Sequence, residues 1–202
     1  MPTDTTASAR ARASDELREV ALEHFATVGF GASSLQQIAD HAGYSKSSVL
    51  YHFASKEALL EAAIGPSIDA LEDLLGDLIE FRRSPGERGA FIDRFVDFLL
   101  ANRLAVHTFV NQGQSLRGIP VIERANVAIN RLAEAVCADE ATAAEQVRFG
   151  VALGGAAFIL ATGNLYRGDA PELPEDEVRT ALVAVLSELL LPVPAGRPDR
   201  AY

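Results

Sequence analysis

Residues 33–60, SSLQQIADHAGYSKSSVLYHFASKEALL, predict two short helices joined by a tight turn, with a third helix beginning directly after them. In the first part, apolar residues recur at the spacing of one helix face: Leu35, Ile38, Ala39 and Ala42. Gly43 can adopt the positive φ with which many helices end, and Ser45 can cap the second helix by accepting a backbone N–H. This stretch therefore has the pattern of a helix-turn-helix.

The second of these helices is predicted to have two different faces. One face holds Lys46, Ser47, Ser48 and Tyr51, and the other holds Val49, Leu50 and Phe53. A short helix whose exposed side chains are small and polar can enter the major groove of DNA. The stretch therefore indicates a DNA-binding protein.

The same stretch resembles the DNA-binding domain of TetR-family (TetR/AcrR-type) transcriptional regulators. The resemblance covers residues 13–60 and rests on Ile38, Ala39, Ala42, Gly43, Ser45, Tyr51, His52, Phe53, Ser55, Lys56, Glu57, Leu59 and Leu60. Two positions depart from the family pattern, because Ser47 stands where such proteins often have glycine and Leu50 where they often have an aromatic residue. Leu50 lacks the hydroxyl of such an aromatic, so Tyr51 is left to contact a phosphate.

The chain as a whole is predicted to be all-α, because helical periodicity recurs along it and no strand pattern appears. We expect an N-terminal helix-turn-helix DNA-binding domain of three helices and a C-terminal helical bundle for ligand binding and dimerisation. The predicted segments are a disordered arm over residues 1–12, the DNA-binding domain over 13–60, the effector-binding and dimerisation domain over 61–192, and a tail over 193–202. Gly65-Pro66 is expected to kink or restart the helix that begins near Lys56.

The distribution of charge is compatible with DNA binding, although the 202-residue chain has a net charge of −10. Residues 1–60 hold five Lys/Arg and seven Asp/Glu, a net charge of −2, whereas residues 61–202 hold thirteen and twenty-one, a net charge of −8. DNA affinity depends on local contacts with phosphates, so a few cations at the interface suffice. Three arginines of the arm either approach the DNA or belong to a solvated tail: Arg10, Arg12 and Arg18.

Cysteine content and hydropathy favour a cytoplasmic protein. Cys137 is the only cysteine, so a disulfide within the chain is impossible and a buried thiol is expected. The first residues lack the apolar core of a signal peptide. The apolar run over residues 150–163 is too short to span a bilayer.

The predicted DNA contacts come from the recognition helix and its neighbours: Ser34, Tyr44, Ser45, Lys46, Ser47, Ser48, Tyr51, His52 and Lys56. Lys46 can donate to guanine or to a phosphate, and hydroxyl groups such as that of Tyr51 can donate to phosphates. Tyr44 is expected to pack on the sugar–phosphate backbone or on a thymine methyl group. His52 is expected to be partly structural, and Lys56 to add positive charge at a helix N-terminus, where anions bind readily.

The last two helices, expected over about residues 141–165 and 175–190, are predicted to form a dimer interface. Small residues on the first leave room for close approach, and the second carries a wide apolar stripe. The predicted interface residues are Gly150, Gly154, Ala157, Val178, Leu182, Val185, Leu186 and Leu189. The family resemblance also implies a dimer built from these helices, and the alternative is an intrachain core.

The middle of the chain is predicted to hold an effector pocket lined by aromatic side chains and a few amides, which suits a mostly apolar ligand. The candidate lining residues are Phe91, Phe95, Phe98, His107, Phe109, Asn111, Gln112, Asn126, Asn130 and Phe158. Phenylalanines at helical spacing are also typical of a core, and His107 is better explained as a core or surface residue than as a metal ligand. We expect no cofactor.

We therefore interpret the chain as a transcriptional regulator, a dimeric repressor that binds a palindromic DNA operator and is released by a small-molecule effector. The resemblance implies that the ligand shifts the helix linking the two parts and changes the spacing of the recognition helices. Three alternatives are an activator or ligand-independent regulator of the same fold, a helical-bundle enzyme, and a ligand-binding dimer that does not bind DNA. The enzyme is disfavoured because no zinc, di-iron, nucleophile or phosphate-loop motif occurs.

Overall fold

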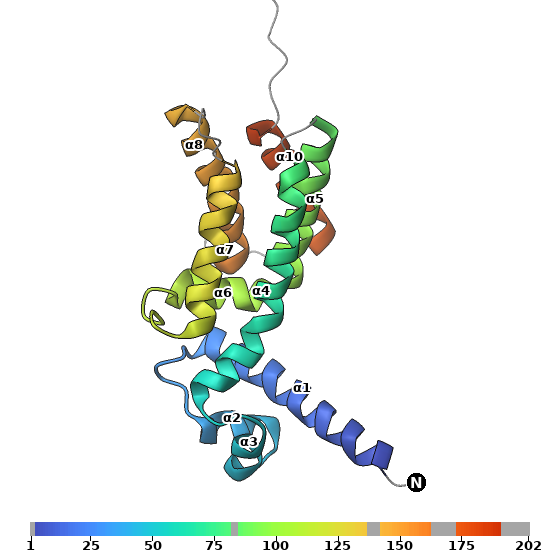
Figure 1. Cartoon of the computed structure of the whole chain (residues 1–202), viewed down its shortest axis with the longest axis vertical. Helices are drawn as coiled ribbons and strands as arrows, with labels where there is room; N and C mark the ends of the chain where they lie inside the picture. Colours follow the sequence, from blue (N-terminus) through green and yellow to red (C-terminus); the bar gives the residue numbers. More distant parts are fainter. Residues whose placement is uncertain (1–2, 82–84, 137–141, 163–172, 191–202) are drawn as a thin grey trace, which may run out of the picture. The chain divides into compact units, whose positions relative to one another are not determined.

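A computed structural model of the chain describes residues 3–81, 85–136, 142–162 and 173–190, and within these ranges all regular structure is helical (Figure 1). The elements are α1 (Thr3–Thr27), α2 (Leu35–Ala42), α3 (Lys46–His52), α4 (Lys56–Phe81), α5 (Pro85–Ala101), α6 (Arg103–Gln112), α7 (Pro120–Val136), α8 (Ala143–Phe149), the π-helix η1 (Gly150–Gly154), α9 (Gly155–Thr162) and α10 (Glu175–Leu190). The prediction of an all-α fold is confirmed.

The chain divides into two compact units, and each is made of two separate stretches of sequence. Unit 1 comprises residues 1–72 and 102–129, and unit 2 comprises residues 73–101 and 130–202. The division does not follow the predicted boundary between residues 60 and 61, which falls inside the continuous helix α4. The helix-turn-helix therefore shares its unit with α6 and the start of α7.

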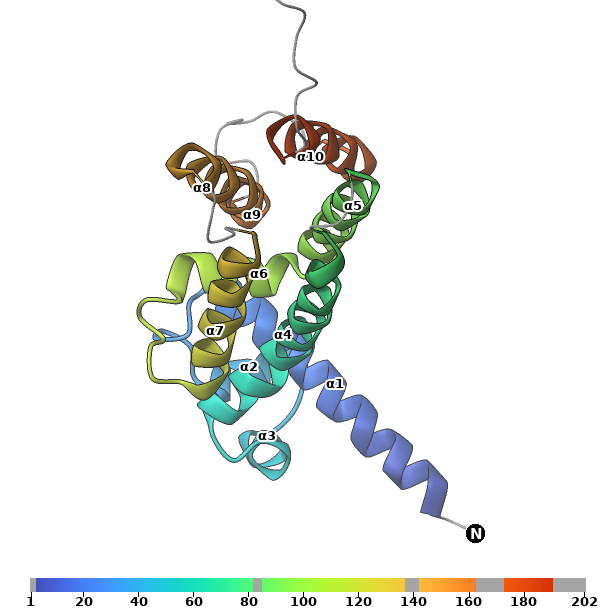
Figure 2. The ribbon, with the colours of Figure 1, turned by 45° about the horizontal axis from the view of Figure 1, so that its top comes forward.

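The core of unit 1 shows why α7 belongs there. Fully or nearly fully buried side chains of α1 to α4 pack together with four residues from the segment that leads into α7 and from α7 itself. The ribbon shows α7 beside the first half of α4 (Figure 2). The contributions from α1 to α4 include Leu17, Phe25, Ile38, Val49 and Leu60, and those from the later segment are Leu116, Val121, Ile122 and Ala125. The hydrophobic core under the recognition helix is thus completed by residues far along the chain.

Ion pairs on the surface of unit 1 fix the same arrangement. Arg124 of α7 donates from Nη2 to Asp69 Oδ1 at 2.6 Å and from Nε to Glu72 Oε1 at 2.9 Å, and both carboxylates belong to α4. The hydrogen bonds to Glu72 and then to Asp69 raise the pKa of Arg124 above its ordinary value. Because these groups are largely exposed, the pairs orient α7 more than they stabilise it.

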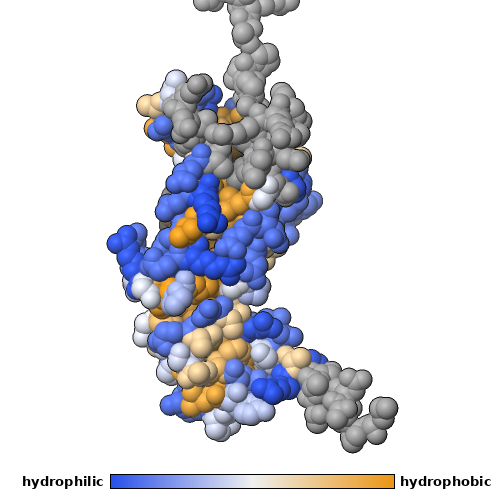
Figure 3. Space-filling model, in the orientation of Figure 1, coloured by the Kyte–Doolittle hydropathy of each residue, from blue (hydrophilic) through white to orange (hydrophobic). Residues whose placement is uncertain are grey.

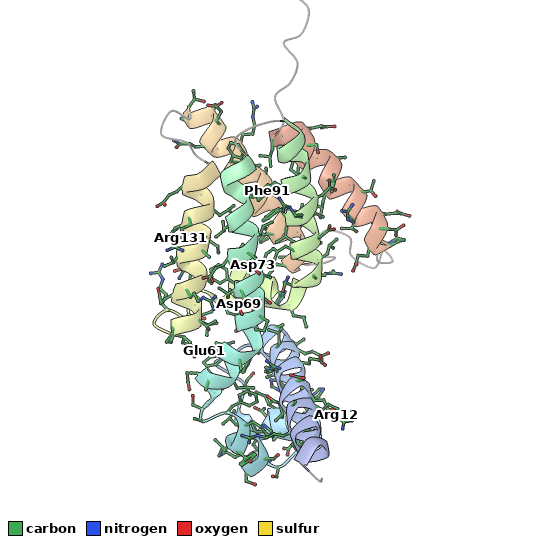
Figure 4. The ribbon with its side chains drawn as sticks, turned by 45° about the vertical axis from the view of Figure 1, so that its right-hand side comes forward. Arg12, Glu61, Asp69, Asp73, Phe91 and Arg131 are labelled. Carbon is green, nitrogen blue, oxygen red and sulfur yellow. The ribbon has the colours of Figure 1, made fainter. Side chains whose placement is uncertain are left out.

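Unit 2 contains α5 packed against α10. Phe91, labelled in Figure 4, stacks on Phe95 with ring centroids 5.9 Å apart, and both rings are buried. Arg179 of α10 donates to Asp97 at 2.6 Å and to Asp93 at 3.3 Å, and both acceptors lie on α5. The bond from Arg179 lowers the pKa of Asp97.

Several expected boundaries are corrected. Residues 3–12 are helical rather than disordered, because the sequence from Thr3 to Thr27 has no glycine or proline and is rich in alanine and arginine, which favour helices. Gly65-Pro66 neither ends nor restarts α4, and Pro66 lies inside it. The expected helix over residues 141–165 includes one π-helical segment, η1. The predictions for Cys137 and for the tail over residues 193–202 fall outside the described residues.

Candidate nucleic-acid interface

The turn between α2 and α3 has the geometry that its sequence predicts. Ser34 and Gln37 form a capping box at the start of α2: Gln37 N donates to Ser34 Oγ at 3.2 Å, and Ser34 N donates to Gln37 Oε1 at 2.9 Å. Gly43 ends α2 with φ 73°, a left-handed conformation that favours glycine. Tyr44 N then donates to Ala39 O at 2.8 Å, which closes the turn.

The recognition helix α3 begins at a serine cap and is anchored by one buried residue. Ser48 N donates to Ser45 Oγ at 3.1 Å, and Val49 is fully buried in the core of unit 1. The hydroxyl of Ser47 lies 2.9 Å from that of Ser45. Among the predicted DNA contacts on α3, Lys46, Ser47 and Tyr51 are exposed, whereas Ser48 and His52 are partly buried.

One residue of α3 lies on a different face from the one predicted. Leu50 was assigned with Val49 to the buried face, but its side chain is 45% exposed, next to Tyr51 at 65%. The helix has only seven residues, so a single buried position, Val49, is enough to anchor it, and its neighbour Leu50 turns toward solvent. Figure 3 shows apolar side chains among hydrophilic ones over the region where Figure 1 draws α2 and α3.

Tyr44 and Tyr51 both contact side chains of α1: Tyr44 forms a hydrogen bond with Glu16, and the ring of Tyr51 lies under Arg10. The Tyr44 hydroxyl donates to Glu16 Oε2 at 2.6 Å, and this hydrogen bond raises the pKa of Tyr44 because it stabilises the protonated phenol. The guanidinium carbon of Arg10 lies 4.9 Å from the ring centroid of Tyr51, within the range of a cation–π interaction. Arg10 therefore brings a positive charge to the exposed side of α3, at Tyr51.

The other two arginines of α1 are placed differently. Arg12 is exposed on α1, as the stick view shows (Figure 4). Arg18 forms an ion pair with Asp15, one turn earlier in the same helix. Of the three arginines considered from the sequence, Arg10 is the one with a cation–π contact to the recognition helix, through Tyr51.

Lys56 makes contacts within the protein that the sequence did not predict, and its DNA contact stays a prediction. Its Nζ donates to Phe30 O and to Ser33 O, both at 2.7 Å, and lies 4.3 Å from the centroid of the Phe30 ring. Because these carbonyls lie in the loop between α1 and α2, the ammonium group holds that loop against the start of α4. His24 adds a bond to the same loop, with Nδ1 2.9 Å from Ser33 Oγ.

Residues of α4 next to Lys56 also favour the helix start. Ala58 N donates to Ser55 Oγ at 3.1 Å, so the Ser55 side chain caps the start of α4. The pKa of Glu57 is lowered by a hydrogen bond from its own backbone N–H and by one from the Ser55 hydroxyl.

His52, the last residue of α3, contacts two neighbouring rings. It stacks edge-on with Tyr51 and at a tilt with Phe53, as expected of a residue whose role is partly structural.

The candidate effector residues are divided between the two units. Phe91, Phe95, Phe98, Asn130 and Phe158 belong to unit 2, whereas His107, Phe109, Asn111 and Asn126 belong to unit 1. Within unit 1, Phe109 packs on the core and Asn111 Nδ2 donates to His107 O in the same helix at 3.0 Å. Phe109 and Asn111 are thus explained by packing and by helix bonding.

The candidate dimer residues are divided between buried and exposed positions. Leu182 and Leu186 are buried inside the chain, on the helix that packs against α5, so these two support the alternative of an intrachain core. Gly150, Gly154 and Val185 are exposed, and Ala157, Val178 and Leu189 are partly buried. Prediction from sequence missed further exposed apolar side chains on the helix formed by α8, η1 and α9: Val147, Val151 and Ile159.

That continuous helix, Ala143–Thr162, is also notable for its hydropathy. It has 20 residues, and an 18-residue window within it has a mean hydropathy of 1.2, with 17% of that window buried. By length and composition alone it is long and apolar enough to cross a membrane, whereas the sequence expectation considered only the shorter run over residues 150–163. Its contacts with α10 place it beside another amphipathic helix of unit 2.

Together, the capped turn, the buried anchor Val49 and the exposed polar side chains of α3 define a helix-turn-helix of the DNA-binding class. The family model described as "Bacterial regulatory proteins, tetR family" matches residues 17–63. The HTH-type transcriptional repressor KstR2 of Mycobacterium tuberculosis is 35% identical over 82 residues, 40% of this chain and 41% of that protein. The HTH-type transcriptional regulator RutR of Escherichia coli is 47% identical over 49 residues, 24% of this chain and 23% of that protein. The chain thus spans less than half the length of these curated relatives.

Solved structures share the fold over most of the chain. The ketosteroid transcriptional regulator KstR2 of Mycobacterium tuberculosis has a TM-score of 0.64 at 21% identity, covering 87% of this chain and 93% of that one. SCO3833, a member of the TetR transcriptional regulator family from Streptomyces coelicolor, has a TM-score of 0.64 at 24% identity, covering 87% and 91%. The predicted resemblance to the TetR family is therefore confirmed, and residues 17–63 form a TetR-type helix-turn-helix domain.

Proposed function

We propose that this protein is a cytoplasmic, sequence-specific DNA-binding transcriptional regulator that represses its target genes. The exposed face of α3 carries the proposal, because Lys46, Ser47 and Tyr51 project from a helix held in the geometry of a TetR-type domain. Lys46 and Arg10 supply positive charge beside hydroxyl groups that can donate to phosphates. The repressor role is proposed from the relative named as a transcriptional repressor, KstR2.

The regulator is proposed to bind a palindromic operator as a homodimer. Two recognition helices related by a twofold axis read half-sites about one DNA turn apart, roughly 34–36 Å. Unit 2 supports this proposal with exposed apolar side chains on two adjacent helices, notably Val147 at 65% and Val185 at 52% exposure. Burying this surface against a second copy removes apolar area from water, which stabilises the dimer.

A small-molecule effector is proposed to release the repressor from DNA. Release requires that the effector bind the DNA-incompetent conformation more tightly than the DNA-competent one. The aromatic residues of unit 2 remain the proposed lining, with Phe98 partly buried beside the buried Phe91 and Phe95. Titration of candidate compounds into the operator complex tests the coupling, and a bound compound that leaves operator affinity unchanged would rule it out as the effector.

Selection of random duplex DNA by the purified protein, followed by sequencing, is expected to enrich an inverted repeat. Lys46→Ala and Tyr51→Ala should each weaken binding to that repeat by about tenfold or more, because each removes a contact with a base or a phosphate. Arg131→Ala is the matched control for lost charge, since Arg131 lies outside the helix-turn-helix, and it should change affinity less than about twofold. Failure of folded protein to enrich any sequence would contradict the proposed function.

The exposed Leu50 is expected to contact a thymine methyl group in the operator. An apolar side chain among the polar ones of a recognition helix fits the only methyl group that the major groove presents. Replacing each operator thymine by deoxyuridine should reveal one position where the wild-type protein loses about 1 kcal/mol of binding free energy, the value of roughly one buried methyl group. Leu50→Ala should bind both DNAs equally, and an unchanged preference for thymine in that variant would refute the contact.

A further inference from the structure

The last residue of α6, Gln112, joins this helix to the loop between α1 and α2. Its Oε1 accepts from Phe30 N at 2.7 Å, and its Nε2 donates to Phe25 O at 2.7 Å. The partners lie 82 and 87 residues away along the chain. The side-chain amide thus bonds to a backbone N–H and a backbone C=O in the same way as a peptide group of a neighbouring strand or turn would.

The loop is shaped to receive this side chain. Gly29, between the two bonded residues, has φ 93°, and a Cβ built there would lie 3.5 Å from Gln112 Oε1. The positive φ turns the chain so that Phe25 O, in the last turn of α1, and Phe30 N face the same amide. Phe25 O also accepts from Gly29 N at 3.1 Å, so the bond from Gln112 adds to a helix-ending turn instead of replacing it.

The same loop is held from its other side by α4. Phe30 uses its N–H for Gln112 and its carbonyl for Lys56 Nζ, so one residue connects α6 to α4. Lys56 also bonds to Ser33 O, next to Ser34, which caps α2. A short chain of hydrogen bonds therefore runs from the end of α6 to the first residue of the helix-turn-helix.

We propose that Gln112 is a positioning residue that holds the helix-turn-helix in its DNA-binding orientation, by bonding to the end of α1 and to the loop after it. This role rests on the proposed DNA-binding function. Both bonds require donor–acceptor distances below about 3.5 Å, so together they fix the position of the loop after α1 relative to the end of α6. Gln112 lies outside the residues that match the family's DNA-binding domain, 17–63, which makes it a contact between that domain and the rest of the chain.

The first readout is hydrogen exchange of the Phe30 amide in the full chain without DNA. Gln112→Ala should accelerate this exchange about tenfold, the factor expected for the loss of one hydrogen bond. Gln112→Glu keeps an acceptor for Phe30 N–H and should leave the exchange slow, which provides a folded variant if the alanine protein does not fold. Asn111→Ala is the matched control, because Asn111 bonds only to a carbonyl of its own helix among the contacts that the described residues show, and it should match the wild type.

The second readout is affinity for the operator obtained by selection. Gln112→Ala should change this affinity about fivefold or more, within the usual range of coupling between sites, while Asn111→Ala should not. A folded Gln112→Ala protein with fast Phe30 exchange and wild-type operator affinity would show that the bridge is merely structural and overturn the positioning role. Unchanged Phe30 exchange would overturn the bridge itself. If the wild-type protein selects no DNA, the proposed DNA-binding function is wrong. The exchange measurement needs no DNA, so it still shows whether Gln112 holds the loop.

Discussion

Ile122→Ala is expected to lower the free energy of unfolding by about 2–5 kcal/mol, the range for truncating a large core side chain. Ile122 lies on α7 and is 0% exposed, in the same core as Ile38 and Val49 of the helix-turn-helix. Removing three carbons leaves a cavity beside the helices that support α3. Urea unfolding followed by circular dichroism measures the loss, and operator affinity should fall as the support of α3 weakens.

The matched control for this prediction lies on the same helix. Ile129 also belongs to α7 but is 37% exposed and is absent from the described core of unit 1. Ile129→Ala should change the free energy of unfolding by less than about 1 kcal/mol. Equal losses for the two variants would mean that burial in the core of unit 1 does not explain the effect.

Lys56→Met is expected to destabilise the protein by about 2–4 kcal/mol, because it removes two hydrogen bonds from a charged donor and leaves two loop carbonyls without it. Methionine keeps most of the aliphatic stem, so the lost ammonium group is the main change. The effect should appear in urea unfolding of the protein without DNA.

The chain supplies a control for Lys56 in its only other lysine, Lys46. Lys46 is exposed on α3, so Lys46→Met should change stability by less than about 0.5 kcal/mol and should weaken DNA binding instead. The two variants separate a lysine that holds the fold from one that faces DNA. A stable Lys56→Met protein that loses only DNA affinity would reverse this assignment.

Prediction from sequence succeeded where the determining interactions are local. The Ser45 cap of α3 and the left-handed Gly43 depend on residues within a few positions of one another, and their residue types specify them. The family resemblance rests on the same local pattern, so the fold class and the position of the recognition helix were both predicted correctly. Tyr51 was likewise expected on the exposed face, and the structure places it there.

Prediction from sequence did not find the bonds that depend on distant partners. Lys56 bonds to two carbonyls of the loop after α1, and Gln112 bonds to Phe30 N in that loop and to Phe25 O in α1. Because every residue carries a backbone carbonyl, the sequence does not show which of them a side chain will contact. The contribution of α7 to the core of unit 1 was missed because amphipathic periodicity shows which face of a helix is buried without showing against what. The helical start of α1 was missed because small polar residues were interpreted as disorder, although alanine and arginine favour a helix.

Unit 1 consists of two separate stretches of sequence, and this affects when it can fold during synthesis on the ribosome. A ribosome releases residues 1–72 well before the segment from Leu116 to Ala125 that completes their core. At about 5–20 residues per second, synthesis of the intervening chain takes roughly 3–10 s. During that time the helix-turn-helix lacks the side chains that complete its core. On the proposed function, a chain that is still being synthesised should therefore bind the operator more weakly than one that has passed Ala125.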